Sequence, residues 1–230
     1  MAVQTAASTA SLSSQLVKRG LRTRAIAHVA PLNSRAGRLC GPAYTLRYIP
    51  MREDLATPAR MGRPDNPHRH AVEHAPPGSV IVVDTHGLDV SGSFGDILAA
   101  RLIVRGVAGI VSDGPMRDLG ELARMDLAIF ARGNAAPPSY ASMMAVDAQL
   151  PVACGGVAVF PGDLIVGDAD GVVVVPQEIA AEVVRDAAEQ DRLEAFLRRK
   201  VEGGAAIEGV YPPDEATRAE YRAWLERGER

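Results

Sequence analysis

The chain has 230 residues, of which 47% are hydrophobic, 23% are charged and 4% are aromatic, and its formal net charge is −3. This length allows one large domain with a sizeable hydrophobic core. The slightly negative charge excludes a general nucleic-acid binder, because binding to phosphates requires clustered lysine and arginine. No apolar run approaches the roughly 20 residues of a membrane-spanning helix, so a membrane-spanning protein is excluded as well.

The cysteines and the start of the chain indicate where the protein is located. Cys40 and Cys154 lack the paired spacing of a zinc knuckle or of a disulfide framework. The first residues lack the basic start and the apolar block of a secretory signal. We therefore expect a cytoplasmic protein with free thiols that binds neither nucleic acid nor a membrane.

The first predicted elements alternate between helix and strand. Residues 11–18 have the apolar spacing of a short helix, which ends at Gly20. An alternating strand is predicted over residues 43–49. Residues 64–67 are polar and rich in turn formers, and residues 70–74 belong to a short helix that ends before a Pro-Pro-Gly stop.

The middle of the chain follows a regular rhythm of strand and helix. Apolar runs predict strands over residues 79–84, 107–112 and 127–131, and helical spacing predicts helices over residues 96–105 and 115–124. Strands that alternate with helices in this way are typically parallel and joined by right-handed crossovers. We therefore expect these three strands to belong to a parallel sheet.

Shorter strands and two helices complete the chain. Residues 157–159, 164–168 and 171–175 are predicted strands, separated by PGD and DADG turns that are typical of hairpins. A long helix is predicted from residue 176 to about residue 200, and an amphipathic helix over residues 214–227. Because no internal repeat or long linker interrupts these elements, we predict one α/β domain with a mixed sheet and helical ends.

Two polar motifs follow the predicted parallel strands. Residues 92–96 (GSFGD) lead into the first of the two helices, and residues 113–121 (DGPMRDLGE) follow the next strand. Both motifs lie at the carboxyl ends of their strands, where open α/β sheets bind ligands. A glycine-bearing turn at a helix N-terminus presents free N–H groups, which suit a carboxylate or a phosphate.

The second motif adds a cation and acidic side chains. The guanidinium of Arg117 can bind a carboxylate through two parallel hydrogen bonds. Asp118 is adjacent, and Asp96 and Glu121 are candidate further oxygen ligands. A site with oxygen ligands alone suits Mg²⁺ or Mn²⁺.

Each motif also has a purely structural interpretation. Gly-Asp before a helix is often a turn with an N-cap, and Arg-Asp in a first helical turn is often a solvated ion pair. The occurrence of both motifs at equivalent strand ends favours a functional site, but the pattern alone names no reaction.

The spacing of the acidic and basic residues resembles the signature of a known family. Asp96 is followed, after twenty intervening residues, by Arg117-Asp118 and then by Glu121, as in the pattern D-x20-R-D-x2-E/D. This family contains 4-hydroxy-4-methyl-2-oxoglutarate aldolase, the related 4-carboxy-4-hydroxy-2-oxoadipate aldolase and the proteins called regulator of ribonuclease activity A. Segments in family order cover most of the chain, among them GRLCGPAYTLR, HRHAVEHAPPGSVIVVD, FGDILAARLIVRGVAGIVSDGPMRD and CGGVAVFPGD.

For the fold, the resemblance implies a single domain over residues 1–230 with a swivelling α/β/α sandwich. The core would span about residues 10–200, and a helical tail would span about residues 201–230. Members of the family form trimers or hexamers with the active site between neighbouring subunits. We therefore expect a homotrimer or homohexamer, in which the long helix and the tail residues Tyr221 and Trp224 take part in assembly.

For the function, the resemblance implies a class II aldolase that needs Mg²⁺ or Mn²⁺, cleaves a 4-hydroxy-2-oxo acid to pyruvate and a second carbonyl compound, and often decarboxylates oxaloacetate. By position, Asp118 would hold the metal and Arg117 would bind the carboxylate of the pyruvyl part. Asp96 would lie near the path of proton transfer. The same carboxylate would be bound by the backbone amides of Gly92, Ser93, Phe94, Gly95, Asp96, Ile97 and Leu98.

Two observations bear on the choice within the family. Glu121 matches an acidic position that regulator-type members tend to lack, so it favours a catalyst and is a further candidate near the metal. The alternative is a non-catalytic regulator that binds and inhibits a ribonuclease through protein–protein contacts. Residues 132–137 (RGNAAP) stand where the family often has a threonine-proline pair, which leaves the physiological substrate open.

Several other polar residues have structural explanations. His68, His70 and His74 share HxHxxxH spacing, but the segment lacks the glutamate of HExxH, so we expect solvated or capping histidines and no zinc site. His86 follows a strand end near the glycine turn and is a candidate pocket residue. Cys154 is predicted to be a small buried residue. The aspartates of the short turns are predicted to be structural: Asp163, Asp168 and Asp170.

Overall fold

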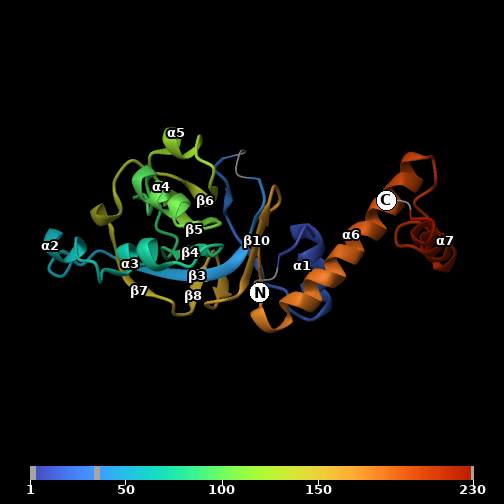
Figure 1. The fold of residues 1–230 in the computed structure, drawn as a ribbon, viewed down its shortest axis with the longest axis horizontal. Coiled ribbons are helices and arrows are strands. Elements are labelled where there is room, and N and C mark those ends of the chain that lie inside the picture. The colour runs from blue at the N-terminus through green and yellow to red at the C-terminus, as the bar shows by residue number, and fades with distance from the viewer. Residues whose placement is uncertain (1–3, 34–36, 229–230) are drawn as a thin grey trace.

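The computed structural model describes residues 4–33 and 37–228. Within them a nine-stranded mixed sheet forms the body of the protein, and a helical arm extends from one side of it (Figure 1). The strands are β1 (Ala25–Ile26), β2 (Ala30–Pro31), β3 (Leu39–Pro50), β4 (Val80–Asp84), β5 (Gly109–Met116), β6 (Ala128–Asn134), β7 (Met143–Ala148), β8 (Val152–Cys154), β9 (Val157–Val159), β10 (Leu164–Asp168) and β11 (Gly171–Val175). The helices are α1 (Thr9–Lys18), α2 (Pro58–Met61), α3 (Pro67–His74), α4 (Asp96–Val104), α5 (Leu119–Leu122), α6 (Ala180–Glu202) and α7 (Glu215–Glu226), with 3-10 turns η2 (Ser139–Ala141) and η3 (Gln177–Ile179).

Four parallel strands form the centre of the sheet. β3, β4, β5 and β6 lie side by side, with Thr45, Val82 and Val111 in register across the first three. All five residues of β4 are buried, as expected for a strand that is covered on both faces. Helices α3, α4 and α5 connect these strands, so the predicted rhythm of strand and helix is confirmed. The carboxyl ends of β4 and β5 therefore meet at one edge of the sheet.

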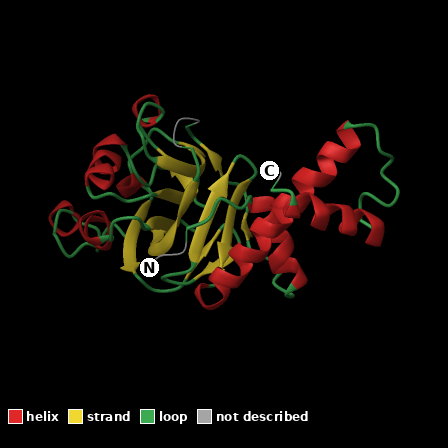
Figure 2. Cartoon of the chain, turned by 45° about the vertical axis from the view of Figure 1, so that its right-hand side comes forward, coloured by secondary structure: helices red, strands yellow, loops and turns green. Residues whose placement is uncertain are grey.

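Each face of the central sheet has its own hydrophobic core. On one face, Ile81 and Val83 pack in a cluster with Val72 of α3 and Leu102 of α4. On the other face, Val82 packs in a second cluster with residues of β8, β9 and β11. Figure 2 shows the strands in the middle, with helices on either side of them. The residues of β4 thus alternate between two cores, which fixes the register of this strand.

Antiparallel strands extend the sheet beyond β3. β10 pairs with both β3 and β11, and β1 completes this edge. The hairpin predicted around the DADG turn is confirmed, since Asp168 pairs with Gly171. The prediction did not include β7, which pairs with the second half of β3, where the register shifts between Arg47 and Tyr48. With its mixed sheet and helices at both ends, the chain has the predicted α/β fold.

The helix predicted over residues 115–124 is wrong in its first half. β5 continues to Met116, because this residue pairs with Asn134 of β6. Asp118 then has a left-handed backbone conformation with φ of 58°, which the interior of a helix does not accept. Only the one-turn helix α5 follows.

Polar contacts join the N-terminal helix to the rest of the chain. The Asp191 carboxylate of α6 accepts hydrogen bonds from the Ser8 N–H (2.7 Å) and the Ser11 hydroxyl (2.6 Å). Asp168 accepts from both the N–H (2.8 Å) and the hydroxyl (2.6 Å) of Thr9. The structural role predicted for Asp168 is therefore confirmed.

The C-terminal helices form an arm with a small core of its own. α6 leads away from the sheet, and α7 folds back against its far end (Figures 1 and 2). Tyr221 and Trp224 are buried there among Phe196, Leu197 and Val210. These two rings fill the contact between α6 and α7 of one chain, and the expected part of this tail in assembly stays a prediction. Within the described residues, no helix combines the length and the apolar character needed to cross a bilayer.

Candidate functional site

The two polar motifs line one cavity at the carboxyl ends of β4 and β5. The volume of this cavity is about 1070 Å³. The turn before α4 and the start of α4 form one wall, the segment after β5 forms the next, and the α2–α3 region and η2 complete it. The predicted site residues that line the cavity are Gly92, Ser93, Gly95, Asp96, Ile97, Leu98, Arg117, Asp118 and Glu121.

Backbone hydrogen bonds hold the two motifs together. The Ser93 N–H donates to the carbonyl oxygen of Pro115 (2.9 Å), and the Arg117 N–H donates to that of Phe94 (2.9 Å). The Gly92 N–H is bonded as well, to a carbonyl oxygen of the segment before η2 (2.9 Å). The amides of Gly92 and Ser93 are therefore engaged within the chain, and the amides that can bind a ligand begin further along the turn.

The start of α4 supplies free amides at the cavity. Gly95 is the N-cap of this helix, and its carbonyl oxygen accepts the first helical hydrogen bond from Ala99 (3.1 Å). The N–H groups of Gly95, Asp96 and Leu98 have no acceptor among the described residues, as expected for the first turn of a helix. The Ile97 N–H donates to the Asp96 carboxylate (2.8 Å). Three amides at the positive end of the helix dipole thus remain for an anion.

Arg117 and Asp118 form an ion pair in the cavity wall. Arg117 Nε donates to Asp118 Oδ2 at 3.2 Å, and each side chain is about one-third exposed. Because this contact uses only Nε, the remaining guanidinium N–H groups of Arg117 can bind a carboxylate of a ligand. The left-handed backbone of Asp118 costs of order 1 kcal/mol, and strain of this kind is concentrated at functional sites.

Glu121 is less available than the other acidic residues of the site. Its carboxylate accepts a hydrogen bond from Arg124 Nη1 (2.7 Å), and both side chains are well exposed. Asp96 is half-buried at the start of α4, and within the described residues its carboxylate accepts from the neighbouring Ile97 amide alone, which leaves one carboxylate oxygen free. Asp96 is therefore better placed than Glu121 to meet a ligand.

The acidic residues suit a hydrated cation. Among residues 4–33 and 37–228, no three His, Cys, Asp or Glu side chains lie close enough together to hold a metal ion. Asp118 offers one partly exposed carboxylate, and Asp96 lines the same cavity. Since Mg²⁺ usually binds through one or two carboxylates and keeps several waters, these residues fit Mg²⁺ or Mn²⁺.

The side chain of His68 lines the cavity, whereas that of Phe94 does not. Phe94 is 1% exposed and supports the turn from behind. The His68 ring lies edge-on to Phe94 and Tyr48, with ring centroids 4.5 and 5.7 Å away, and its Nε2 is buried without a partner in the described chain. Burial, with a smaller contribution from the charge of Arg69, lowers the pKa of His68 to about 4. The expected solvated or capping role is therefore wrong for His68, whose ring is neutral at neutral pH.

The other histidines lie away from the cavity. The exposed rings of His70 and His74 stack on each other, with centroids 4.1 Å apart. His86 was a candidate pocket residue, but it does not line the cavity. Its N–H donates to the Asp84 carboxylate (2.9 Å), so it belongs to the turn after β4.

Cys154 and the turn aspartates have structural positions. Cys154 is fully buried, as predicted, and burial raises the pKa of its thiol. Asp163 accepts hydrogen bonds from the N–H groups of Phe160 (2.9 Å) and Gln177 (3.2 Å), so it holds two turns together. Asp170 is exposed, and its N–H donates to Asp168 within the DADG turn (3.0 Å).

The α2–α3 region contributes residues that the sequence did not predict to line the site. Asn66, His68 and Arg69 line the cavity from the start of α3. The Asn66 side chain caps this helix by accepting from the His68 N–H (3.1 Å), and Pro67 occupies the first turn. An Asn-Pro pair is a typical helix start, so the sequence carried a signal for the beginning of α3. No signal in the sequence indicated that α3 would pack over the start of α4.

Comparison with known proteins relates the chain to one family. Residues 9–174 match the RraA-like family model, described as Aldolase/RraA. A protein of Halalkalibacterium halodurans, named "Putative 4-hydroxy-4-methyl-2-oxoglutarate aldolase", is 40% identical over 107 residues, which cover 46% of this chain and 50% of that protein. The chain therefore spans about half the length of this curated relative.

Solved structures support the same relationship. An uncharacterised protein from Pseudomonas syringae pv. tomato has a TM-score of 0.80 and 28% identity, with 91% of each chain covered. Streptomyces coelicolor RraAS2, described as an unusual member of the RNase ES inhibitor RraA protein family, has a TM-score of 0.72 and 34% identity, with 83% of this chain and 91% of that chain covered. The family signature, the fold and these matches agree, and the chain belongs to the RraA-like family.

Proposed function

We propose that the protein is a class II pyruvate aldolase that depends on Mg²⁺ or Mn²⁺. It cleaves a 4-hydroxy-2-oxo acid to pyruvate and a second carbonyl compound, and it decarboxylates oxaloacetate. The observation that carries the proposal is the meeting of free α4 amides with the Arg117–Asp118 pair in one cavity. The name of the Halalkalibacterium relative points to the same class of reaction.

The carboxylate next to the 2-oxo group binds between Arg117 and α4. The guanidinium of Arg117 donates two hydrogen bonds to it, and the amides of Gly95, Asp96 and Leu98 provide further donors. These donors are fixed by the backbone and by the contact with Asp118, so little reorganisation is needed when the substrate binds. The 2-oxo carbon is thereby held close to the Asp118 carboxylate.

The aldol cleavage breaks the bond between C3 and C4. The C4 hydroxyl gives its proton to the Asp96 carboxylate, its oxygen becomes the carbonyl of the second product, and the bonding pair moves through C3 toward the 2-oxo oxygen. C3 then takes the proton back from Asp96, which yields pyruvate and restores the carboxylate. In oxaloacetate the same bond breaks, and CO₂ leaves. In both reactions negative charge develops on the 2-oxo oxygen, and Arg117 and the α4 amides stabilise it.

A divalent cation held by Asp118 would add Lewis-acid stabilisation of the same oxygen. Asp96 lines the same cavity and can also contact the hydrated cation. Glu121 is paired with Arg124 at the edge of the cavity, so it contributes little to cation binding.

Pyruvate release from oxaloacetate tests the proposal. We expect activity with Mg²⁺ or Mn²⁺, loss of activity with EDTA and recovery when the cation is added back. Arg117→Ala and Asp118→Ala should each lower kcat/KM by about 100-fold or more. The control Arg222→Ala removes an exposed arginine that pairs with Glu215 on α7 (2.8 Å) and should retain full activity. A wild-type protein that releases no pyruvate with either metal, or variants as active as the wild type, would refute the proposal.

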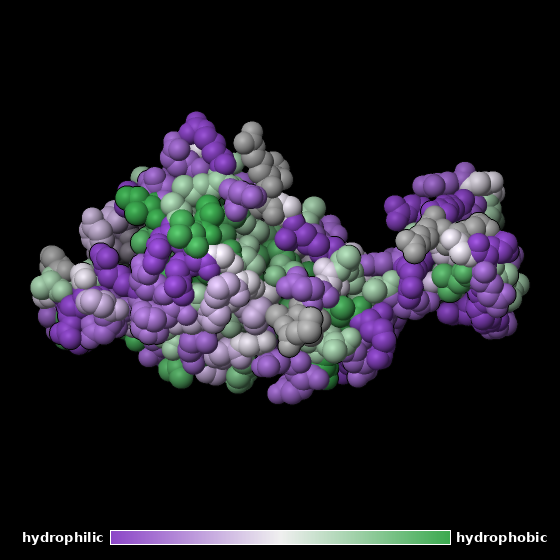
Figure 3. All heavy atoms as spheres, viewed as in Figure 1, coloured by the Kyte–Doolittle hydropathy of each residue, from purple (hydrophilic) through white to green (hydrophobic). Residues whose placement is uncertain are grey.

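A second candidate function is inhibition of a ribonuclease, favoured by the description of the Streptomyces coelicolor relative. In this second function the exposed apolar side chains of α4 would bind the ribonuclease in place of another copy of the chain, since Ile97 is 79% exposed and Val104 is 76% exposed. Figure 3 shows apolar residues gathered over this helix. Inhibition of purified RNase ES by the wild type, lost in Val104→Asp and independent of Mg²⁺, would support this second function. Absence of inhibition at micromolar concentrations would exclude it.

A further inference from the structure

Arg69 is a second arginine in the wall of the cavity. Among the described residues, Arg117 and Arg69 are the two arginines that line it. Arg117 is paired with Asp118, whereas Arg69 has no ion-pair partner in the described part of the chain. One cation of the wall is therefore balanced by a carboxylate of the protein, and the other is not.

The acidic residues closest to Arg69 in the sequence are engaged elsewhere. Asp65 accepts two hydrogen bonds from Arg63, at 2.9 and 3.0 Å. Glu73, one helical turn further along α3, pairs with Arg101 of α4 (2.7 Å). An i,i+4 spacing would favour contact between Arg69 and Glu73 on the helix surface. The chain makes a different pairing and leaves the charge of Arg69 uncompensated.

The position of Arg69 is unfavourable for the helix that carries it. The residue lies in the first turn of α3, which contains no acidic side chain. The positive end of the helix dipole disfavours a cation there. Its Nε nevertheless donates to the carbonyl oxygen of Met61 (3.2 Å), another residue of the cavity wall, so the guanidinium is held against the α2 segment. An anion bound at this position would offset both the dipole and the missing partner.

We propose that Arg69 binds a second anionic group of the substrate, a carboxylate in the first instance, while Arg117 binds the carboxylate next to the 2-oxo group. This inference rests on the proposed function, because it assigns the opposite end of the same substrate. The protein then selects 2-oxo acids with two carboxylates over those with one.

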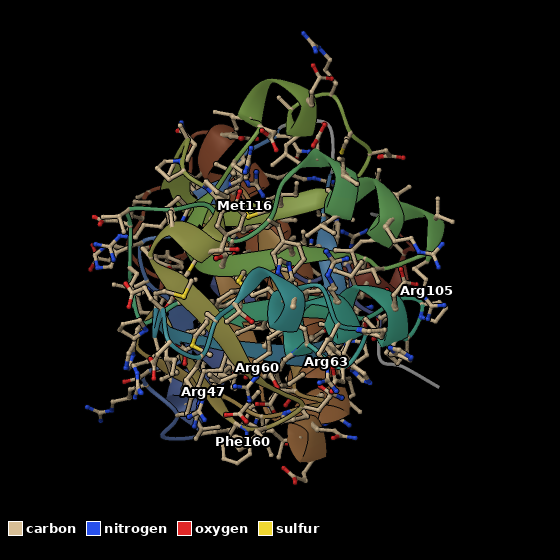
Figure 4. The ribbon with its side chains drawn as sticks, turned by 90° about the vertical axis from the view of Figure 1, so that its left-hand side faces the viewer. Arg47, Arg60, Arg63, Arg105, Met116 and Phe160 are labelled. Carbon is tan, nitrogen blue, oxygen red and sulfur yellow. The ribbon has the colours of Figure 1, made fainter. Side chains whose placement is uncertain are left out.

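The neighbours of Arg69 do not replace its charge. The neutral ring of His68 adjoins it and provides only uncharged hydrogen-bonding groups at neutral pH. Arg60 and Arg63 lie on the α2 segment that faces the viewer in Figure 4, and they line an adjoining cavity of about 480 Å³. Neither of them lines the cavity that holds the Arg117–Asp118 pair. Arg69 is therefore the residue that sets the preference for charge.

Direct binding of two unreactive ligands tests the assignment without turnover. 2-Oxoglutarate has a second carboxylate, and 2-oxopentanoate has the same chain length without it. Titration calorimetry of the purified protein with Mg²⁺ should show that 2-oxoglutarate binds about tenfold more tightly, the effect of one charged hydrogen-bonded contact. Arg69→Gln should remove this preference and change 2-oxopentanoate binding less than about twofold. Arg69→Lys should restore part of the preference, because it restores the charge.

Arg60→Gln is the matched control, because it removes an arginine of the neighbouring segment that does not line this cavity. It should bind both ligands as the wild type does. The assignment of Arg69 is overturned if the wild type does not distinguish the two ligands, or if Arg69→Gln weakens both equally. If the preference is present and depends on Arg69 but no pyruvate is released from any substrate, the aldolase proposal fails and the anion site stands.

Discussion

A methyl group on Gly95 would lie 2.4 Å from Asp118 Oδ2, well inside van der Waals contact. The absence of a side chain at this position lets the start of α4 approach the carboxylate of the second motif. Gly95→Ala should therefore displace Asp118 or the amides of the first turn. Because a misplacement of about 1 Å can lower catalysis about 100-fold, we expect a loss of that order in pyruvate release.

Gly120→Ala provides the steric control for this prediction. A methyl group on Gly120 would meet nothing within 4 Å, so this variant should retain activity within about twofold of the wild type. Circular dichroism should show both variants folded. Equal activity of Gly95→Ala and the wild type would contradict the proposed contact between turn and carboxylate.

The parallel centre of the fold could be predicted because its signals are local. The strand SVIVVD, for example, is a continuous apolar run between a Pro-Pro-Gly stop and a polar turn, as expected for β4 buried on both faces. The strands β2 and β7 were missed, since they are defined by their pairing with β6 and β3 and not by a pattern of their own. The helix predicted after β5 failed for the same reason, because Met116 pairs with Asn134.

The same distinction between local patterns and distant contacts holds for the residues of the candidate site. Arg117 and Asp118 follow a strand directly and belong to a spaced signature, so the sequence could single them out. Arg69 and His68 lie more than one element earlier and reach the cavity only because α3 packs over the start of α4. The hydrogen bond of the Gly92 amide could not be predicted from the sequence either, because its acceptor belongs to the distant segment before η2.

Asp113 should be required for stability. This carboxylate is 5% exposed and accepts hydrogen bonds from the N–H (2.7 Å) and hydroxyl (2.9 Å) of Thr85 and from the N–H of Gly155 (3.2 Å). Asp113→Ala leaves these buried donors without a partner, so the free energy of unfolding in urea should fall by about 2–4 kcal/mol. Asp170→Ala, at an exposed turn, should change it by less than about 0.5 kcal/mol. Similar stabilities of the two variants would contradict this role.

The stability of the protein should fall as the pH decreases from about 6.5 to 4 because of His68. Burial, together with the charge of Arg69, lowers its pKa from 6.5 to about 4, so in this range the unfolded chain binds a proton that the folded protein does not. Protonation of the unfolded chain has no effect on the free energy of unfolding well above pH 6.5 and lowers it by about 3 kcal/mol at pH 4. Urea unfolding at pH 7.5 and 4.5 should show a smaller decrease for His68→Asn than for the wild type. His74→Asn, at an exposed position, should keep the wild-type decrease.

The exposed apolar face of α4 should belong to a contact between copies of the chain. Ile97 and Val104 lie two turns apart on this helix, are 79% and 76% exposed, and adjoin the cavity through Asp96 at the start of the same helix. Since exposed apolar side chains on one helix are typical of protein contacts, we expect a trimer or hexamer by sedimentation, and Val104→Asp should dissociate it. If neighbouring subunits complete the site, pyruvate release should fall together with assembly. Val17→Asp, which changes a half-exposed apolar residue of α1, should leave both unchanged. A fully active wild-type monomer at micromolar concentration would show that α4 faces solvent or a different partner.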